Sequence, residues 1–90
     1  MHKATVRFWS CFDKLSPSIQ KLARKNYSLL KENPQYPSLH FKKVGKFWSA
    51  RVGKNYRALA IKDNEGFIWV WIGNHDGYEQ LINVGNKFID

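Results

Sequence analysis

The sequence predicts an α+β fold: two N-terminal helical segments packed on a small, twisted antiparallel β-sheet, with a β-meander in the C-terminal half. Apolar residues recur at spacings of three and four between residues 17 and 32, as on the buried face of a helix. After residue 46, three runs rich in aromatic and β-branched residues are joined by short connections containing Gly, Asn or Asp, as hairpins require. The chain has 90 residues, so we expect a single domain spanning 1–90, with a weakly determined tail at 83–90.

The N-terminal half carries start and stop signals for a helix. Thr5–Phe8 is expected to form a short first strand, and Trp9–Leu15 a turn of helix. Ser16 followed by Pro17 favours the start of a longer helix, because serine suits the capping position and proline the first turn. This helix should end at Asn33, since the residue before a proline disfavours helical geometry. Its expected core-facing stripe is Ile19, Leu22, Ala23, Asn26, Leu29 and Leu30.

The second half predicts strands at Phe47–Val52, Tyr56–Lys62 and Phe67–Ile72. If residues 53–55 form the first turn, Arg51 lies directly opposite Arg57 and both guanidinium groups project from one face. Like charges directly opposite each other destabilise a sheet, so this pair needs an anion or a carboxylate nearby. The alternative to anion binding is a structural salt bridge, for which the candidate carboxylates are Asp13, Asp76 and Glu79.

The second hairpin gives further expectations about the sheet faces. A two-residue turn at Asn64 and Glu65 pairs Ala60 with Trp69 and Ala58 with Trp71, which puts both indoles on one face for packing or for base stacking. The aliphatic face under the helices is then Leu59, Ile61, Ile68, Val70 and Ile72. A short helical turn is expected at residues 77–82, and Phe88 and Ile89 are candidates to dock on the sheet.

Charge is the strongest compositional signal. Fifteen Lys and Arg against seven Asp and Glu give a formal net charge of +8, which indicates a polyanionic partner such as nucleic acid or an acidic protein; the alternative is a basic solubilising surface. A single cysteine excludes an internal disulfide, and the histidines lack metal-ligand spacing, so we expect no metal and no cofactor. We find no signal peptide or membrane-spanning run, and we expect a cytoplasmic protein.

Three groups of residues are candidates for chemistry. The first is the pair Arg51 and Arg57, whose planar guanidinium groups suit phosphate oxygens. The second is the end of the last strand, where His75 can titrate near neutral pH and Tyr78 can hydrogen-bond or stack. The third is the basic segment before residue 47, which is either a phosphate-binding surface or a solvated edge strand. Its candidate residues are His40, Lys43 and Lys46.

Together these groups suit cleavage of RNA by attack of its own 2′-hydroxyl on the adjacent phosphate. That reaction needs a general base, a general acid and cations that stabilise the phosphorane, but no protein nucleophile and no metal. His75 would be the acid or base, Arg51 and Arg57 would stabilise the phosphorane, and Tyr78 would position or stack a base.

Several segments together resemble the RelE/ParE superfamily, the toxins of type II toxin–antitoxin systems. They are Pro17–Leu22, Pro37–Lys42, Trp48–Gly53, Tyr56–Leu59 and Trp71–Tyr78, and the similarity extends from about residue 8 to residue 82. The resemblance implies helices on an antiparallel sheet and a cognate antitoxin that neutralises the toxin. It also implies that Arg57 matches the strand arginine that contacts the scissile phosphate, and that His75 and Tyr78 match the C-terminal residues of mRNA-cleaving members. Lys43 and Lys46 fall in a region that supplies basic residues.

The resemblance covers two known activities. Members of the RelE and HigB branches cleave mRNA on the ribosome, whereas members of the ParE branch poison DNA gyrase. The ending with His75 and Tyr78 favours the first, so we expect a ribosome-dependent mRNA endoribonuclease whose partners are mRNA, the ribosome and an antitoxin. The alternatives are a gyrase poison and a catalytically inactive basic module that binds RNA or antitoxin.

Overall fold

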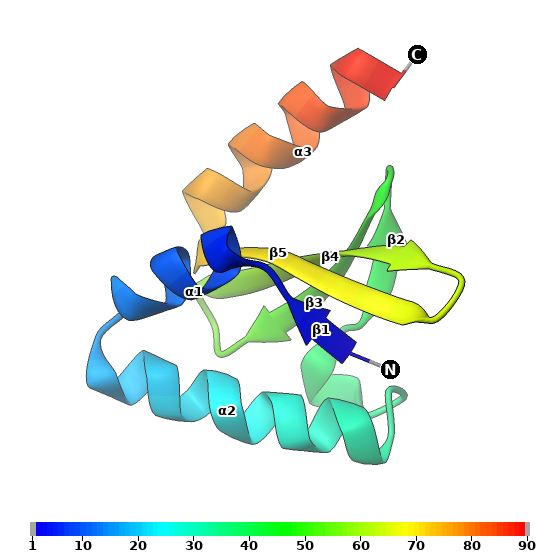
Figure 1. Ribbon diagram of the computed structural model, residues 1–90. Helices are drawn as coiled ribbons and strands as arrows, with labels where there is room; N and C mark the ends of the chain where they lie inside the picture. The colour runs from blue at the N-terminus through cyan, green and yellow to red at the C-terminus, as the bar shows by residue number, and fades with distance from the viewer. Residues whose placement is uncertain (1, 90) are drawn as a thin grey trace.

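The structure is a computed structural model that describes the backbone of residues 2–89 and the side chains of residues 2–83. A five-stranded sheet has the order β1-β5-β4-β3-β2 (Figure 1). Neighbouring strands are antiparallel except β1 and β5, which are parallel, so the sheet is mixed. In chain order the elements are β1 (His2–Ala4), α1 (Val6–Asp13), α2 (Pro17–Glu32), the short 3₁₀ turn η1 (Pro37–Leu39), β2 (Lys42–Val44), β3 (Phe47–Val52), β4 (Tyr56–Asp63), β5 (Gly66–Asn74) and α3 (His75–Ile89).

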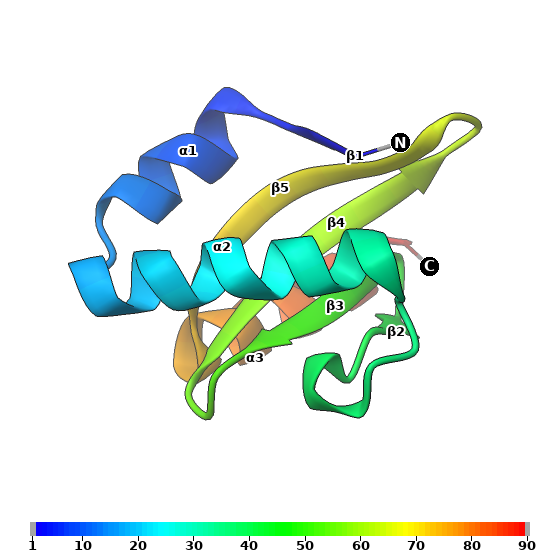
Figure 2. The same cartoon turned by 90° about the horizontal axis from the view of Figure 1, so that it is seen from below.

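The helices lie on both sides of the sheet. α1 and α2 cover one face, and α3 extends from the end of β5 on the other side (Figures 1 and 2). The predicted α+β class, with two N-terminal helices on one face of a small sheet, is confirmed.

The N-terminal segment differs from the prediction. Thr5–Phe8 is not a strand, because the Thr5 hydroxyl accepts a hydrogen bond from the backbone N–H of Phe8 at 3.1 Å and thereby caps α1. The strand lies just before it, at His2–Ala4, and runs beside β5. The Trp69 indole N–H donates to His2 Nδ1 at 3.0 Å, which ties this edge strand to the core.

The contact between His2 and Trp69 should make stability depend on pH. Burial, followed by nearby positive charge that includes Lys31, holds the pKa of His2 below its ordinary value of 6.5. The unfolded chain therefore binds this proton more readily, so the free energy of unfolding should fall as the pH drops from 6.5 towards the folded-state pKa. Urea denaturation at about pH 8 and about pH 5.5 measures the change in the free energy of unfolding for the wild type and for His2→Phe. The wild type should lose more stability than the variant, and equal losses would contradict the assignment.

α2 follows the sequence prediction at both ends. Ser16 occupies the N-cap with Pro17 in the first turn, and the helix ends at Glu32, directly before Asn33. Ala23 and Leu30 of the predicted stripe are buried in the core beneath the helix.

The first hairpin also has the predicted register. Arg51 pairs with Arg57, and Val52 pairs with Tyr56 across the turn that contains Gly53. Gly53 has a φ of +66°, and a Cβ there would lie 2.7 Å from Leu22 Cδ2, so the turn requires glycine.

The second hairpin departs from the predicted register at a β-bulge. Ala60 pairs with Trp69 as expected, but the ladder then shifts, so Leu59 pairs with Trp71 and Ala58 pairs with Ile72. The extra residue reverses which face the later side chains occupy. The expected pairing of Ala58 with Trp71 is therefore wrong, and the two tryptophans occupy opposite faces.

Each face of the sheet consequently has its own apolar cluster. The face under α1 and α2 carries small and aromatic residues rather than the predicted aliphatic set, with Ala58, Ala60, Trp69 and Ile72 in one cluster with Phe12 and Leu30. On the other face, Leu59 packs with Phe47 and with Ile82 of α3. Of the predicted aliphatic face, only Ile72 belongs to the cluster under α1 and α2.

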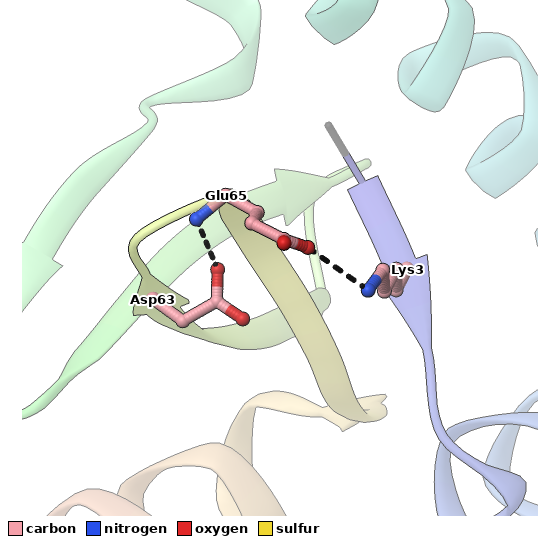
Figure 3. Close-up of polar contacts among 3 residues, drawn as sticks. All are labelled: Lys3, Asp63 and Glu65. Atoms are coloured by element: carbon pink, nitrogen blue, oxygen red, sulfur yellow. Dashed lines mark hydrogen bonds and ion pairs between the residues drawn. The ribbon is translucent and has the colours of Figure 1, made fainter.

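Polar contacts hold the turn between β4 and β5 (Figure 3). The Asp63 carboxylate accepts from the backbone N–H of Glu65 at 2.8 Å, as in an Asx turn. Lys3 of β1 forms an ion pair with Glu65 at 3.3 Å. The turn is thus fastened to the edge strand.

α3 is longer than the helical turn predicted at residues 77–82. Asn74 caps the start of α3, because its side-chain oxygen accepts a hydrogen bond from the backbone N–H of Gly77 at 2.9 Å. The backbone N–H of His75 donates to Asn55 O at 2.9 Å, which joins the start of α3 to the turn between β3 and β4. The expected docking of Phe88 and Ile89 lies outside the described side chains.

Candidate functional site

Arg51 and Arg57 form a directly opposed pair of half-buried cations. Arg51 Nε donates to Gly53 O at 3.0 Å, and Arg57 Nη1 donates to Tyr56 O at 2.9 Å. Within residues 2–83 neither arginine forms a salt bridge, and Glu79 pairs instead with His75 at 3.6 Å. Two unneutralised guanidinium groups on neighbouring strands favour an anion between or above them.

These two arginines lie on the face of the sheet opposite α1 and α2. Alternation along β3 and β4 puts Arg51 and Arg57 on the side of Phe47 and Leu59, whose cluster includes α3. We call this side, defined by Phe47, Ser49, Arg51, Arg57 and Leu59, the arginine face. It is separate from the apolar cluster under α1 and α2.

The end of β5 brings His75 and Tyr78 to the arginine face. Arg57 Cζ lies 5.9 Å from the centre of the Tyr78 ring, within the range of a cation–π contact. The rings of His75 and Tyr78 are 5.6 Å apart. His75 is about half exposed, with 45% of its side-chain surface accessible, so it can reach a bound substrate. Arg57, Tyr78 and His75 therefore lie next to one another, and Arg51 lies directly opposite Arg57.

The basic segment divides between the two faces. Arg51 Nη1 lies 3.3 Å from His40 Nε2, and Lys46 Nζ lies 5.3 Å from the ring of Phe47, so both residues border the arginine face. Lys43 pairs with Trp48, which belongs to the face under α1 and α2. The structure thus does not bring Lys43 to the arginines.

Lys42 is not among the expected candidates of the basic segment, which are His40, Lys43 and Lys46. It pairs with Ser49 and so lies on the arginine face. Alternation is the sequence signal for Lys42, because every second side chain of an extended strand lies on the same face of the sheet.

Asn26 is a second residue with an unexpected role. It lies in the apolar stripe of α2, and its side-chain amide donates to Arg51 O at 3.1 Å. A polar residue within an apolar stripe is the sequence signal for such a contact, since a buried amide needs a partner. α2 therefore fixes the backbone of Arg51 from the opposite side of the sheet.

The Trp71 indole leaves no room for a side chain at the neighbouring positions Gly73 and Gly77. Gly73 pairs with Arg57, and a Cβ at Gly73 would lie 2.4 Å from Trp71 Cζ2. A Cβ at Gly77 would likewise lie close to the indole, 2.9 Å from Trp71 Cζ2. The indole therefore lies across the end of β5 and supports the start of α3.

Gly73→Ala should destabilise the protein, because Trp71 must leave its packing against the cluster of Leu59 and Ile82. We expect a loss of about 1–3 kcal/mol, as for other overpacking substitutions. Thermal denaturation measures it, since each kcal/mol lowers the Tm of a domain of this size by about 4–8 °C. Adding Trp71→Leu should recover part of the loss by freeing the space, and an unchanged Tm in the single variant would refute the contact.

The arrangement offers cations, a titratable ring and a phenol in one place. Such a set can hold a phosphate diester and transfer protons on either side of it. Within residues 2–83 no group of three His, Cys, Asp or Glu side chains could hold a metal ion. None of the described helices is long and apolar enough to cross a lipid bilayer.

Comparisons with known proteins agree with this fold. The family model of the ParE-like toxin domain matches residues 17–80. No curated protein sequence matches the chain significantly. Among solved structures, RelE in the RelB–RelE antitoxin–toxin complex from Methanococcus jannaschii is similar, with a TM-score of 0.68 at 15% identity, covering 87% of this chain and 95% of that chain.

Two further structures have the same fold. A mutant of the E. coli toxin RelE in the free state gives a TM-score of 0.64 at 13% identity, covering 88% of this chain and 86% of that one. The toxin–antitoxin complex RelBE2 from Mycobacterium tuberculosis gives a TM-score of 0.61 at 20% identity, covering 83% of this chain and 96% of that one. The family model spans most of the chain, including both arginines, His75 and Tyr78. The chain therefore belongs to the ParE-like toxin domain family, within the RelE/ParE superfamily of toxin–antitoxin toxins.

Proposed function

We propose that this protein is the toxin of a type II toxin–antitoxin system and acts as an mRNA interferase, a ribosome-dependent endoribonuclease that inhibits translation. The observation that carries the proposal is the opposed pair Arg51 and Arg57, which has no carboxylate partner within residues 2–83 and adjoins Tyr78 and His75. A phosphate diester supplies the missing negative charge.

The proposed reaction is attack of a ribose 2′-oxygen on the adjacent phosphorus. The bond from phosphorus to the 5′-oxygen breaks, which leaves a 2′,3′-cyclic phosphate on one fragment and a 5′-hydroxyl on the other. A general base takes the 2′-proton and a general acid protonates the departing 5′-oxygen. His75 supplies one of these roles.

The remaining site residues bind and orient the RNA in this proposal. Arg51 and Arg57 stabilise the phosphorane charge, and Tyr78 positions or stacks a base. Lys46 contacts neighbouring phosphates from the rim of the arginine face, where Lys42 lies as well. Lys43 would reach RNA only from the other face, beside Trp48.

The proposed partners follow from the charge and from the relatives. A net charge of +8 suits binding to mRNA and the ribosome. An activity on ribosome-bound mRNA would take place in the cytoplasm. Two of the similar structures, from Methanococcus jannaschii and Mycobacterium tuberculosis, are toxin–antitoxin complexes. A cognate antitoxin here should carry acidic residues that neutralise the basic face.

A second candidate function is poisoning of DNA gyrase. The name of the matching family, ParE-like toxin domain, favours it. Gyrase poisoning predicts DNA damage and no requirement for His75, whereas RNA cleavage predicts shortened transcripts. A third possibility, an inactive binding module, predicts no toxicity.

Mapping transcript 5′ ends after brief expression, with and without the gene adjacent to the toxin gene, separates these functions. We expect new 5′ ends within translated regions, which disappear when the adjacent gene is coexpressed. DNA damage with intact transcripts would favour the gyrase function, and normal growth with intact transcripts would favour the inactive module.

A further inference from the structure

His40 has an unusual backbone conformation. Within the described residues it is the only non-glycine residue with positive φ, at +44°, and it caps the η1 turn just after the fully buried Leu39. A left-handed conformation is strained for a residue with a side chain, and it persists only where the surrounding structure imposes it. The fold therefore holds His40 in a defined place although its side chain is exposed.

That place is beside Arg51. His40 precedes the first residue of β2 by two positions, and that residue, Lys42, pairs with Ser49. Arg51 Nη1 lies 3.3 Å from His40 Nε2. Because a guanidinium can only donate, His40 Nε2 is the acceptor in this contact.

Three contacts from three elements determine where Arg51 lies. Asn26 of α2 donates to its carbonyl oxygen, Gly53 O in the turn accepts from Nε, and His40 accepts from Nη1. The Nη2 amine has no partner among the described side chains, so it is available to an anion on the arginine face.

We propose that His40 is a positioning residue that orients the Arg51 guanidinium for phosphate, rather than a phosphate ligand itself. Nε2 of His40 is occupied in the contact with Arg51 and therefore does not donate to a phosphate oxygen. This inference rests on the proposed RNA cleavage, and it changes the role that the sequence suggests for His40. His40 would affect cleavage only by holding Arg51 in position.

A double-mutant cycle tests this route. His40→Gly removes the acceptor and relieves the backbone strain, whereas His40→Gln retains an acceptor oxygen at a similar reach. His40→Gly should lower the rate of mRNA cleavage about 10-fold by loosening Arg51, and His40→Gln should restore most of it. In an Arg51→Ala background, His40→Gly should cause no further loss. An additive loss in that background would show direct action of His40 and overturn the proposal.

An NMR measurement separates this inference from the proposed function, because it needs no activity. In the purified wild type without RNA, contacts at Nε and Nη1 should restrict Arg51, giving a slowly exchanging, well-dispersed Nε–H signal. His40→Gly should shift this signal and increase its solvent exchange, and His40→Gln should do so less. An Arg51 signal unaffected by His40→Gly would overturn the proposal even if the protein cleaves RNA. The expected change in a protein that cleaves no RNA would support the contact and reject only the proposed function.

Discussion

Replacing Arg57 by glutamine should lower the rate of mRNA cleavage by about 10²–10³-fold, comparable to removal of one preorganised donor from a site that stabilises a transition-state anion. Arg57 is anchored by Tyr56 O and lies over Tyr78, so its charge is fixed where the phosphorane would form. It does not belong to either apolar cluster, and the fold should survive the change. The measurement is single-turnover cleavage in a reconstituted translation reaction.

Arg7→Gln is the matched control for Arg57→Gln. Arg7 is exposed on α1, away from the arginine face, and its replacement removes the same charge. Arg7→Gln should cleave at nearly the wild-type rate. Equal losses in the two variants would show that net charge, rather than the arginine pair, governs activity.

His75→Ala should lower cleavage by about 10²–10⁴-fold, the usual contribution of a positioned acid or base. Its ring lies 5.6 Å from the Tyr78 ring at the start of α3, and His75 belongs to neither apolar cluster. Expression of the variant should relieve most of the growth arrest. Growth curves together with circular dichroism of the purified variant measure both effects.

Glu79→Gln separates proton transfer by His75 from the contact between His75 and Glu79. Both side chains are exposed, with 45% of the His75 side chain and 61% of the Glu79 side chain accessible to solvent. Such exposed pairs contribute little to stability. Glu79→Gln should therefore retain most of the activity. Full growth arrest by a folded His75→Ala variant would reject His75 as the acid or base.

The parts of the site predicted from sequence depend on local signals. The glycine turn after Val52 determined the register that sets Arg51 opposite Arg57. The strand β5 was visible in the sequence as an apolar run directly before the polar residues that include His75 and Tyr78. Serine, proline and a periodic stripe likewise predicted α2.

The features that the sequence did not predict depend on tertiary contacts or on a shift of one residue in strand pairing. The bulge after Trp69 leaves no clear pattern in a run that is apolar on both faces, yet it moves Trp71 to the arginine face. The parallel pairing of His2–Ala4 joins segments more than 60 residues apart, for which the local sequence holds no signal. Lys42 rather than Lys43 faces the arginines because β2 pairs only with β3, and that pairing sets its register.

The most direct measurement of the central claim is the chemical nature of the RNA ends. Attack by the 2′-oxygen leaves a 5′-hydroxyl on the downstream fragment, which ligates to an adapter only after phosphorylation by a polynucleotide kinase. In a reconstituted translation reaction, the wild type should produce kinase-dependent 5′ ends on ribosome-bound mRNA, and Arg57→Gln should produce few. Ends that ligate without the kinase, and therefore carry 5′-phosphates, would contradict 2′-hydroxyl attack at the arginine face.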